Sequence, residues 1–347
     1  MCSKRCVLVF VLGMLCSVLG PTAAAQNVPV LPSSCFVYIS AHDLGVDMGA
    51  AVPPEAVLVN QNTVPGEGGL SIYQLPLWNC APPGKRSPCP ACGHPISLAD
   101  ADTYIQQTDV KVPGLSNGLS LVRTWHSKWS SIQSGFQVGL FGPNWRSTFE
   151  EQIFLGSDDY LRYVRGDGDF WSFGFSSYGV YKLAAPQNEA ATLNPPSTST
   201  PYWTLKFQNG EQRHFDSTTG FLTAIIDRNG NTTTLTYDSA SRLATITDAA
   251  SRHLTFTYGS PSSHLVTGVS SDVGISLSYA YDSQGRLSQV TKPDQSTLSF
   301  TYNSQSLITA VTDSNGKILE SHAYDSSGRG LTSARAGGIE AVTITYP

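Results

Sequence analysis

The chain has 347 residues and a net charge of −5; 40% of its residues are hydrophobic and only 14% are charged. The length predicts two or three domains, and the hydrophobic content excludes a disordered polyampholyte. The acidic balance argues against nucleic acid as a partner, because nucleic-acid binding normally requires a basic face. The 31 glycines and 21 prolines favour turns and strands over long helices.

Residues 1–25 have the three parts of a signal peptide. Lys4 and Arg5 precede an apolar stretch at 6–20, and small residues end at Ala25. We expect cleavage after Ala25 and a secreted or cell-surface protein. Cleavage moves the net charge from −5 to −7, because it removes two cations and no anions. A retained anchor is the alternative, but the apolar stretch is short for a membrane span, and no later segment predicts a stable one.

Residues 26–90 are rich in proline and glycine and predict an irregular segment with one or two short strands. The cysteines that remain after cleavage are Cys35, Cys80, Cys89 and Cys92. An even number in an exported chain predicts disulfides, and three pairings stay open. The spacing of Cys89 and Cys92, with His94 beside them, also resembles half of a zinc knuckle, and free thiols are a third possibility.

Residues 91–155 predict a small β domain, and residues 156–214 predict β-hairpins that lead into the repeats. In the first segment, Leu119, Leu121 and Arg123 alternate with other residues, which is typical of a strand at an edge or interface. In the second, Asn209-Gly210 lies between two apolar runs and is a strong hairpin signal.

Apart from the open zinc alternative at Cys89 and Cys92, no group of residues in the chain predicts catalysis, a cofactor or a metal. The acidic pairs Asp158-Asp159 and Asp167-Gly-Asp169 could supply calcium ligands, but hairpin turns explain them better. Glu150 and Glu151 are adjacent, so on a strand their side chains point to opposite faces. No phosphate-binding loop or nucleophile elbow is present in the sequence.

Residues 215–347 contain six units of about 22 residues, which predicts a repeat architecture. The units begin at Phe215, Tyr237, Tyr258, Tyr281, Tyr302 and Tyr324. Within a repeat the aromatic residue starts a turn, an Asp or Asn stabilises it, and a Gly or Ser four residues later permits the bend, although the copy at Tyr258 lacks the Asp. We expect Leu243, Leu287 and Leu307 to occupy equivalent buried strand positions. In an unbroken strand, Gln289 would share the face of Leu287.

The unit resembles the YD repeat of RHS proteins, which teneurins and the C components of toxin complexes share. The signature residues are Tyr237, Asp238, Arg242 and Leu243 in one copy; Tyr281, Asp282, Gly285, Arg286 and Leu287 in the full match; and Tyr324, Asp325, Gly328 and Arg329 in a third. The segment from Gly93 to Trp145 resembles the small domain that precedes such repeats. The resemblance implies an all-β structure whose repeated hairpins form a curved or spiralling sheet, a partial shell, behind a small β-rich domain.

In the resembled family the shell can enclose a C-terminal toxin, which a downstream segment cuts free. No such segment occurs before Tyr346-Pro347, so no catalytic residue carries over, and we expect the last hairpin to need a further segment. We predict a non-enzymatic scaffold, toxin-carrier fragment or cell-surface interaction module. Its partner would be a downstream RHS or toxin polypeptide, or a glycan.

Two alternative functions stay open. One is the N-terminal part of a polymorphic toxin whose catalytic part lies elsewhere. The other is a carbohydrate-binding module with exposed aromatic platforms, although aromatic side chains usually pack in cores. The candidate platforms are Trp125, Trp129, Trp145, Trp171 and Trp203.

Overall fold

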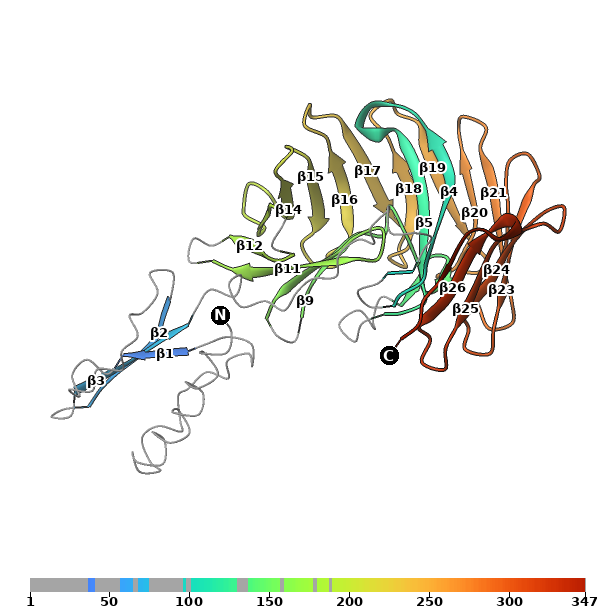
Figure 1. Cartoon of the computed structure of the whole chain (residues 1–347). Coiled ribbons are helices and arrows are strands. Elements are labelled where there is room, and N and C mark those ends of the chain that lie inside the picture. Colours follow the sequence, from blue (N-terminus) through green and yellow to red (C-terminus); the bar gives the residue numbers. More distant parts are fainter. Residues whose placement is uncertain are drawn as a thin grey trace. The chain divides into compact units, whose positions relative to one another are not determined.

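The computed structural model describes residues 37–40, 57–64, 68–74, 96–97, 101–129, 137–156, 159–176, 180–186 and 189–346. These residues form strands and turns, with two short 3₁₀ turns, η4 (Leu115–Asn117) and η6 (Ala336–Gly338), and no α-helix (Figure 1). No helix in this part of the chain has the length and apolar character needed to cross a membrane.

The chain divides into two compact units. The first comprises residues 1–84, 154–162 and 171–195, and the second comprises residues 85–153, 163–170 and 196–347. Strands β9 (Gln152–Leu155), β10 (Leu161–Val164) and β11 (Phe170–Phe175) each contain residues of both units.

The first unit contains two small groups of antiparallel strands. Strands β1 (Val37–Ser40), β2 (Val57–Val64) and β3 (Gly68–Gln74) form a sheet in the order β1-β3-β2. Strand β12 (Tyr181–Ala185) pairs with β11 on one side and with β13 (Ala191–Asn194) on the other.

The second unit contains a long antiparallel meander and a smaller sheet. The smaller sheet has the order β4 (Tyr104–Val112), β5 (Leu119–His126), β8 (Trp145–Ser147), with the short pair β6 (Val138–Gly139) and β7 (Gly142–Pro143) beside it in the chain. The strands of the meander are β14 (Tyr202–Phe207), β15 (Gln212–Asp216), β16 (Leu222–Ile226), β17 (Thr232–Tyr237), β18 (Leu243–Thr247), β19 (His253–Tyr258), β20 (Val266–Ser271), β21 (Ser276–Tyr281), β22 (Leu287–Thr291), β23 (Thr297–Tyr302), β24 (Ile308–Asp313), β25 (Ile318–Tyr324), β26 (Gly330–Arg335) and β27 (Ile339–Thr343).

Each repeat unit is a pair of strands, and in β17, β19, β21 and β23 the second strand of the pair alternates between more buried and more exposed residues. In β19, Leu254 and Phe256 are buried while Thr255 and Thr257 are exposed. This period of two places one apolar face against a core and leaves the other face to solvent. The prediction of an all-β fold built from repeated hairpins is therefore confirmed.

The first strand of each unit departs from a period of two. In β22, Leu287 and Val290 are fully buried, while Ser288 and Gln289 are half-buried. Tyr281 opposes Leu287 and Ala280 opposes Gln289, so Ser288 is the extra residue of a β-bulge. The expectation that Gln289 shares the face of Leu287 is wrong, because the bulge shifts the buried position to Val290.

The predicted burial of Leu243 and Leu287 is confirmed, and Leu307 is also buried. Leu307 is not their equivalent, however. Tyr302 opposes Ile308 as Tyr281 opposes Leu287, so Ile308 holds the equivalent position. Leu307 instead occupies the place that Arg286 has in its own unit, because the amide of Asn303 donates to Leu307 as that of Asp282 donates to Arg286.

The described residues within 96–153 of the same unit contact the apolar face of the meander, and we call them the brace. Phe141 lies 4.8 Å from Tyr279, and Trp145 lies 5.3 Å from Phe300, measured between ring centroids. The meander curls toward strands β4 and β5 (Figure 1). The core of this unit is thus shared between two segments that are far apart in the sequence.

Candidate functional site

Each repeat tyrosine ties its unit to the preceding one through its hydroxyl group. The hydroxyl of Tyr302 donates to the carbonyl of Leu287 at 2.7 Å, and that of Tyr281 donates to Val266 at 2.6 Å. The same bond joins Tyr237 to Leu222, Tyr258 to Leu243, Tyr324 to Ile308 and Tyr346 to Gly330. Burial raises the pKa of Tyr302 to about 12. Burial likewise raises the pKa values of Tyr237, Tyr258, Tyr281 and Tyr324, so these tyrosines and Tyr302 stay neutral donors at physiological pH.

The aspartate that follows the tyrosine organises the turn. Asp282 accepts the amides of Gln284 and Arg286 through one oxygen and the Arg286 guanidinium through the other, at 2.7 Å. Burial opposes ionisation of Asp282, but these hydrogen bonds outweigh burial and lower its pKa. Gly285 adopts a φ of 74°, which favours glycine at the bend.

The arginine then stacks on the tyrosine of the next unit. The guanidinium carbon of Arg286 lies 4.5 Å from the ring centroid of Tyr302, and the corresponding distance from Arg242 to Tyr258 is 4.4 Å. Asp238 with Arg242 and Asp325 with Arg329 repeat the ion pair of Asp282 with Arg286.

The signature alternates between two kinds of unit. Arg242, Arg286 and Arg329 lie in every second unit, and apolar residues hold the same place in the units between them. Those residues are Phe221, Leu265 and Leu307. Phe221 stacks on Tyr237 at 5.2 Å, and Leu307 approaches the next turn at Gly328. The incomplete copies are therefore a second type of joint, and the structural period is two units.

A buried ion pair lies between the brace and the meander. Arg123 of β5 and Asp109 of β4 form a bidentate ion pair. Nε of Arg123 lies 2.5 Å from Oδ2 of Asp109, and Nη2 of Arg123 lies 2.8 Å from Oδ1. The hydroxyl of Tyr279, on β21, donates to the same carboxylate at 2.7 Å. The guanidinium carbon lies 4.7 Å from the Trp145 ring centroid and 6.0 Å from that of Phe300.

Burial alone would lower the pKa of Arg123, but the attraction of Asp109 outweighs it, and the pKa is raised. Burial and then the charge of Asp109 raise the pKa of Tyr279 well above its ordinary value. Arg123 is therefore a permanent cation and Tyr279 a permanent donor. This arrangement holds two segments of the chain together.

Backbone hydrogen bonds add further anchors along the brace. The amides of Leu222, Val266 and Gly330 donate to the carbonyls of Glu151, Leu140 and Ala101 respectively, at 3.3, 2.9 and 3.0 Å. Because these amides open β16, β20 and β26, the brace is fixed to units from both ends of the meander.

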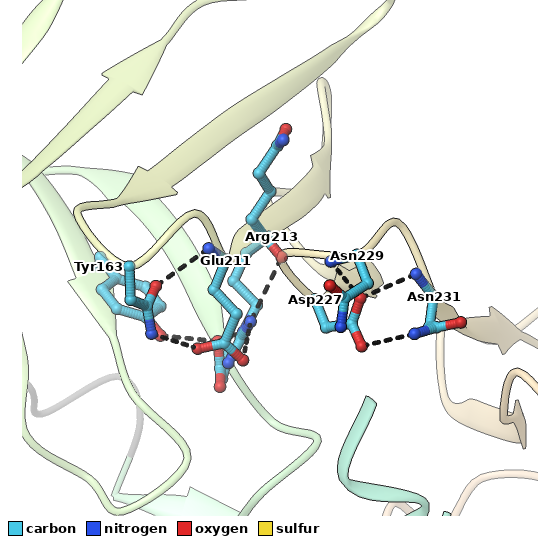
Figure 2. A network of polar contacts seen from close by, with 9 residues as sticks. Tyr163, Glu211, Arg213, Asp227, Asn229 and Asn231 are labelled. Carbon is cyan, nitrogen blue, oxygen red and sulfur yellow. Dashed lines mark hydrogen bonds and ion pairs between the residues drawn. The ribbon is translucent and has the colours of Figure 1, made fainter. Parts of the chain in front are cut away.

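A second polar network joins the end of the brace to β15 (Figure 2). Glu151 accepts the hydroxyl of Tyr163 at 2.7 Å and Nε of Arg213 at 3.2 Å, and Arg213 also contacts Glu211. Burial, followed by the charge of Glu151, raises the pKa of Tyr163 well above its ordinary value. Glu151 is thus held by hydrogen-bond donors in a structural role.

The turn formed by Asp227, Asn229 and Asn231 has the alternating oxygen groups of a calcium loop (Figure 2). The carboxylate of Asp227 already accepts hydrogen bonds within this turn, however. Asp227 accepts the amides of Asn229 and Asn231 and the Asn231 side-chain amide at 2.8–2.9 Å. Within the described residues, no three acidic, histidine or cysteine side chains gather as metal ligands.

A third buried pair lies near the start of the brace. Nδ1 of His126 lies 2.6 Å from Asp102, and Nε2 lies 2.5 Å from the carbonyl oxygen of Asp167. Both nitrogens can donate only when the imidazole carries two protons. Ser127 contacts Asp102 rather than His126, so the three residues do not form a nucleophile–base pair.

The structure places the other predicted residues as follows. Cys35, Cys80, Cys89 and Cys92 lie outside the described residues. Trp125, Trp145 and Trp171 are buried, so they cannot stack on a sugar, whereas Trp129 and Trp203 are half-buried. Asp167 pairs with Arg165 at 3.0 Å within its turn, as the hairpin interpretation expects.

Asp109 and Tyr279 are the site residues that sequence reasoning missed. Arg123 had one signal, since it follows Leu119 and Leu121 at the alternate positions of a predicted interface strand. Its partners Asp109 and Tyr279 have no such signal in the sequence, because Tyr279 lies 170 residues from Asp109. Only the folded chain brings these side chains together.

Comparison with known families gives two matches. A domain of unknown function, DUF6531, matches residues 93–173, and the teneurin YD-shell matches residues 203–335. Curated proteins give no match.

Among solved structures, the complex TcdB2-TccC3-Cdc42 is 14% identical over 55% of this chain, with a TM-score of 0.31. TcdB2-TccC3 is 14% identical over 55% of this chain, with a TM-score of 0.30, and TcdB2-TccC3-TEV is 13% identical over 53%, with a TM-score of 0.26. The chain spans 12% of the length of each of these solved chains.

Proposed function

This chain belongs to the RHS/YD-repeat family, and we propose that it is a non-enzymatic scaffold, a length of repeat wall locked by its own brace. The observation that carries the proposal is the buried ion pair of Arg123 and Asp109, which Tyr279 of the meander completes. A catalytic cleft needs accessible groups that can exchange protons. Here the charged groups of the buried centre hold one another.

The position of the buried ion pair against the meander supports a locking role. Removing one partner of a buried pair leaves an uncompensated charge and costs about 3–5 kcal/mol. Because both partners belong to the brace, separation of the brace would break the Tyr279 hydrogen bond and the ring contacts with Tyr279 and Phe300, whereas loss of Asp109 would leave Arg123 as an unpaired charge against the meander. A wall of repeats gains from such a device, because each unit by itself contacts mainly its neighbours.

A cleavage experiment tests the locking role. A protease site inserted at Thr198, in the exposed stretch 197–199, separates the brace from the repeats in sequence. We expect the two fragments to co-elute in size-exclusion chromatography after cleavage. In the cleaved Asp109→Ala variant they should separate. Separation of the fragments without that substitution would refute the locking role.

We further propose that the scaffold acts outside the cell, as a toxin-carrier segment or a cell-surface module. The proposal rests on the tripartite start of the sequence, with Lys4, Arg5 and Ala25 at its boundaries. The intact mass of secreted protein should correspond to a chain that begins at Gln26. Recovery from the cytoplasm with Met1 present would contradict this.

A further inference from the structure

The face of the meander that points away from the brace carries two rows of hydroxyl side chains. Cross-strand register defines the first row as Thr236, Thr245, Thr255, Ser270 and Ser276. It defines the second as Thr257, Gly268, Ser278, Thr291 and Thr297. Together these ten positions are the hydroxyl rows, and nine of them carry a hydroxyl group.

The hydroxyl rows are accessible and uncharged. Thr236, Thr255 and Ser278 are exposed, and no position of either row holds an acidic or basic side chain. Charges lie in the turns instead, where Asp248 pairs with Arg252 at 2.6 Å and Asp282 with Arg286 at 2.7 Å. An uncharged surface flanked by paired charges has little attraction for nucleic acid, anionic lipid or a charged protein.

The hydroxyl groups keep hydrogen-bonding capacity. Thr236 and Thr245 lie 2.6 Å apart between their Oγ1 atoms, and Thr257 donates to the carbonyl of Gly268 at 3.2 Å. A hydroxyl has one donor and two acceptor sites, so each of these oxygens can still accept from a ligand. Neighbouring strands are about 4.8 Å apart, so a row of five positions extends for about 20 Å.

We propose that the hydroxyl rows bind a neutral polysaccharide whose chain runs across the strands. A sugar chain presents hydrogen-bond donors and acceptors without charge. One sugar ring is about as long as the distance between two neighbouring strands. A second copy of this chain fits less well, because the sheet curls toward the brace and two such outer faces would touch over a small area (Figure 1). This proposal goes beyond the scaffold role and uses none of the residues of the buried centre.

Native gel electrophoresis in gels that contain dextran, laminarin, hydroxyethyl cellulose or galactomannan tests the proposal. We expect retardation by at least one of these neutral polymers and none by alginate, which is anionic. Thr255→Lys and Ser278→Lys should each weaken the apparent affinity about tenfold or more. Thr255→Val removes the hydroxyl while keeping the side chain's shape, and it should also weaken binding.

Gln284→Lys is the matched control, because it adds the same charge at an exposed turn position outside the rows. It should keep the affinity of the unsubstituted chain. Retardation by none of the four polymers, stronger retardation by alginate, or equal loss in Gln284→Lys would overturn the proposal. The fragment co-elution that tests the scaffold is unaffected by any of these outcomes.

Discussion

At the residue scale, the tyrosine hydroxyl is the smallest group that links consecutive units. In Tyr302→Phe, the carbonyl of Leu287 loses its 2.7 Å donor while the ring remains. We expect the free energy of unfolding to fall by about 1–3 kcal/mol, because the carbonyl of the buried Leu287 loses its hydrogen-bond donor. Urea denaturation measures the change. Tyr202→Phe leaves the repeat bonds untouched and should be close to neutral; equal effects of the two would contradict this role.

The bulge makes a second prediction at this scale. Val290 is fully buried and Gln289 is half-buried, although a regular strand would place Gln289 on the face of Leu287. Val290→Asp should therefore cost several kcal/mol, on the order of 3–5, because it removes apolar burial and adds an unpaired charge. Gln289→Asp should cost far less. The opposite ranking in denaturation would show that the strand has no bulge there.

At the element scale, the half-buried repeat tyrosines predict how stability depends on pH. Burial raises the pKa of Tyr302 to about 12 and raises those of Tyr237, Tyr258, Tyr281 and Tyr324 as well. A tyrosine in the unfolded chain ionises near pH 10, so the folded state binds more protons above that pH. Stability should be fully present below about pH 10 and fall as the pH rises toward 12.

Absorbance titration of phenolate, combined with urea midpoints from pH 8 to pH 12, tests this dependence. The repeat tyrosines should ionise together with loss of structure. Ionisation of all tyrosines near pH 10 in a chain that stays folded would contradict the buried hydroxyl bonds.

Strand β26, the first strand of the last unit, begins with a glycine where the preceding unit has a large apolar residue, because the brace packs closely against this position. Its first residue is Gly330, where the preceding unit has Ile308, and a Cβ at Gly330 would lie 2.4 Å from Oγ1 of Thr103 and 3.0 Å from Ile96. Gly330→Leu restores the side chain typical of the repeat, yet we expect it to destabilise the chain by about 1–3 kcal/mol through overpacking.

Thr103→Ala relieves part of that contact and supplies the control. The double variant should recover part of the loss in thermal denaturation. Stabilisation by Gly330→Leu alone would mean that the brace does not reach this strand.

At the scale of the whole molecule, the repeats were predictable and the brace was not. Six aromatic starts at a regular period specify hairpins, and the expected bends occur at Ser241, Gly285, Ser306 and Gly328 with φ between 59° and 74°. These features are local, so the sequence carries them directly. The exact buried set was not predictable, because a bulge changes the period of the first strand in each unit.

The buried centre depends on contacts between distant segments. Arg123 and Asp109 lie in neighbouring strands, but Tyr279 comes from the third repeat unit, and nothing in the local sequence relates them. The two kinds of joint were also hidden, because Leu265 and Leu307 look like failures of the signature until their packing on the next turn is known.

The central claim is that the brace and the repeat wall form one cooperative structure. Native-state hydrogen exchange of the full chain tests it most directly, because exchange gives an opening free energy for each strand. Strands β4 and β5 should open with the same free energy, and the same denaturant dependence, as β18 to β23. Opening of β4 and β5 at a much lower free energy, while the repeats stay protected, would contradict it.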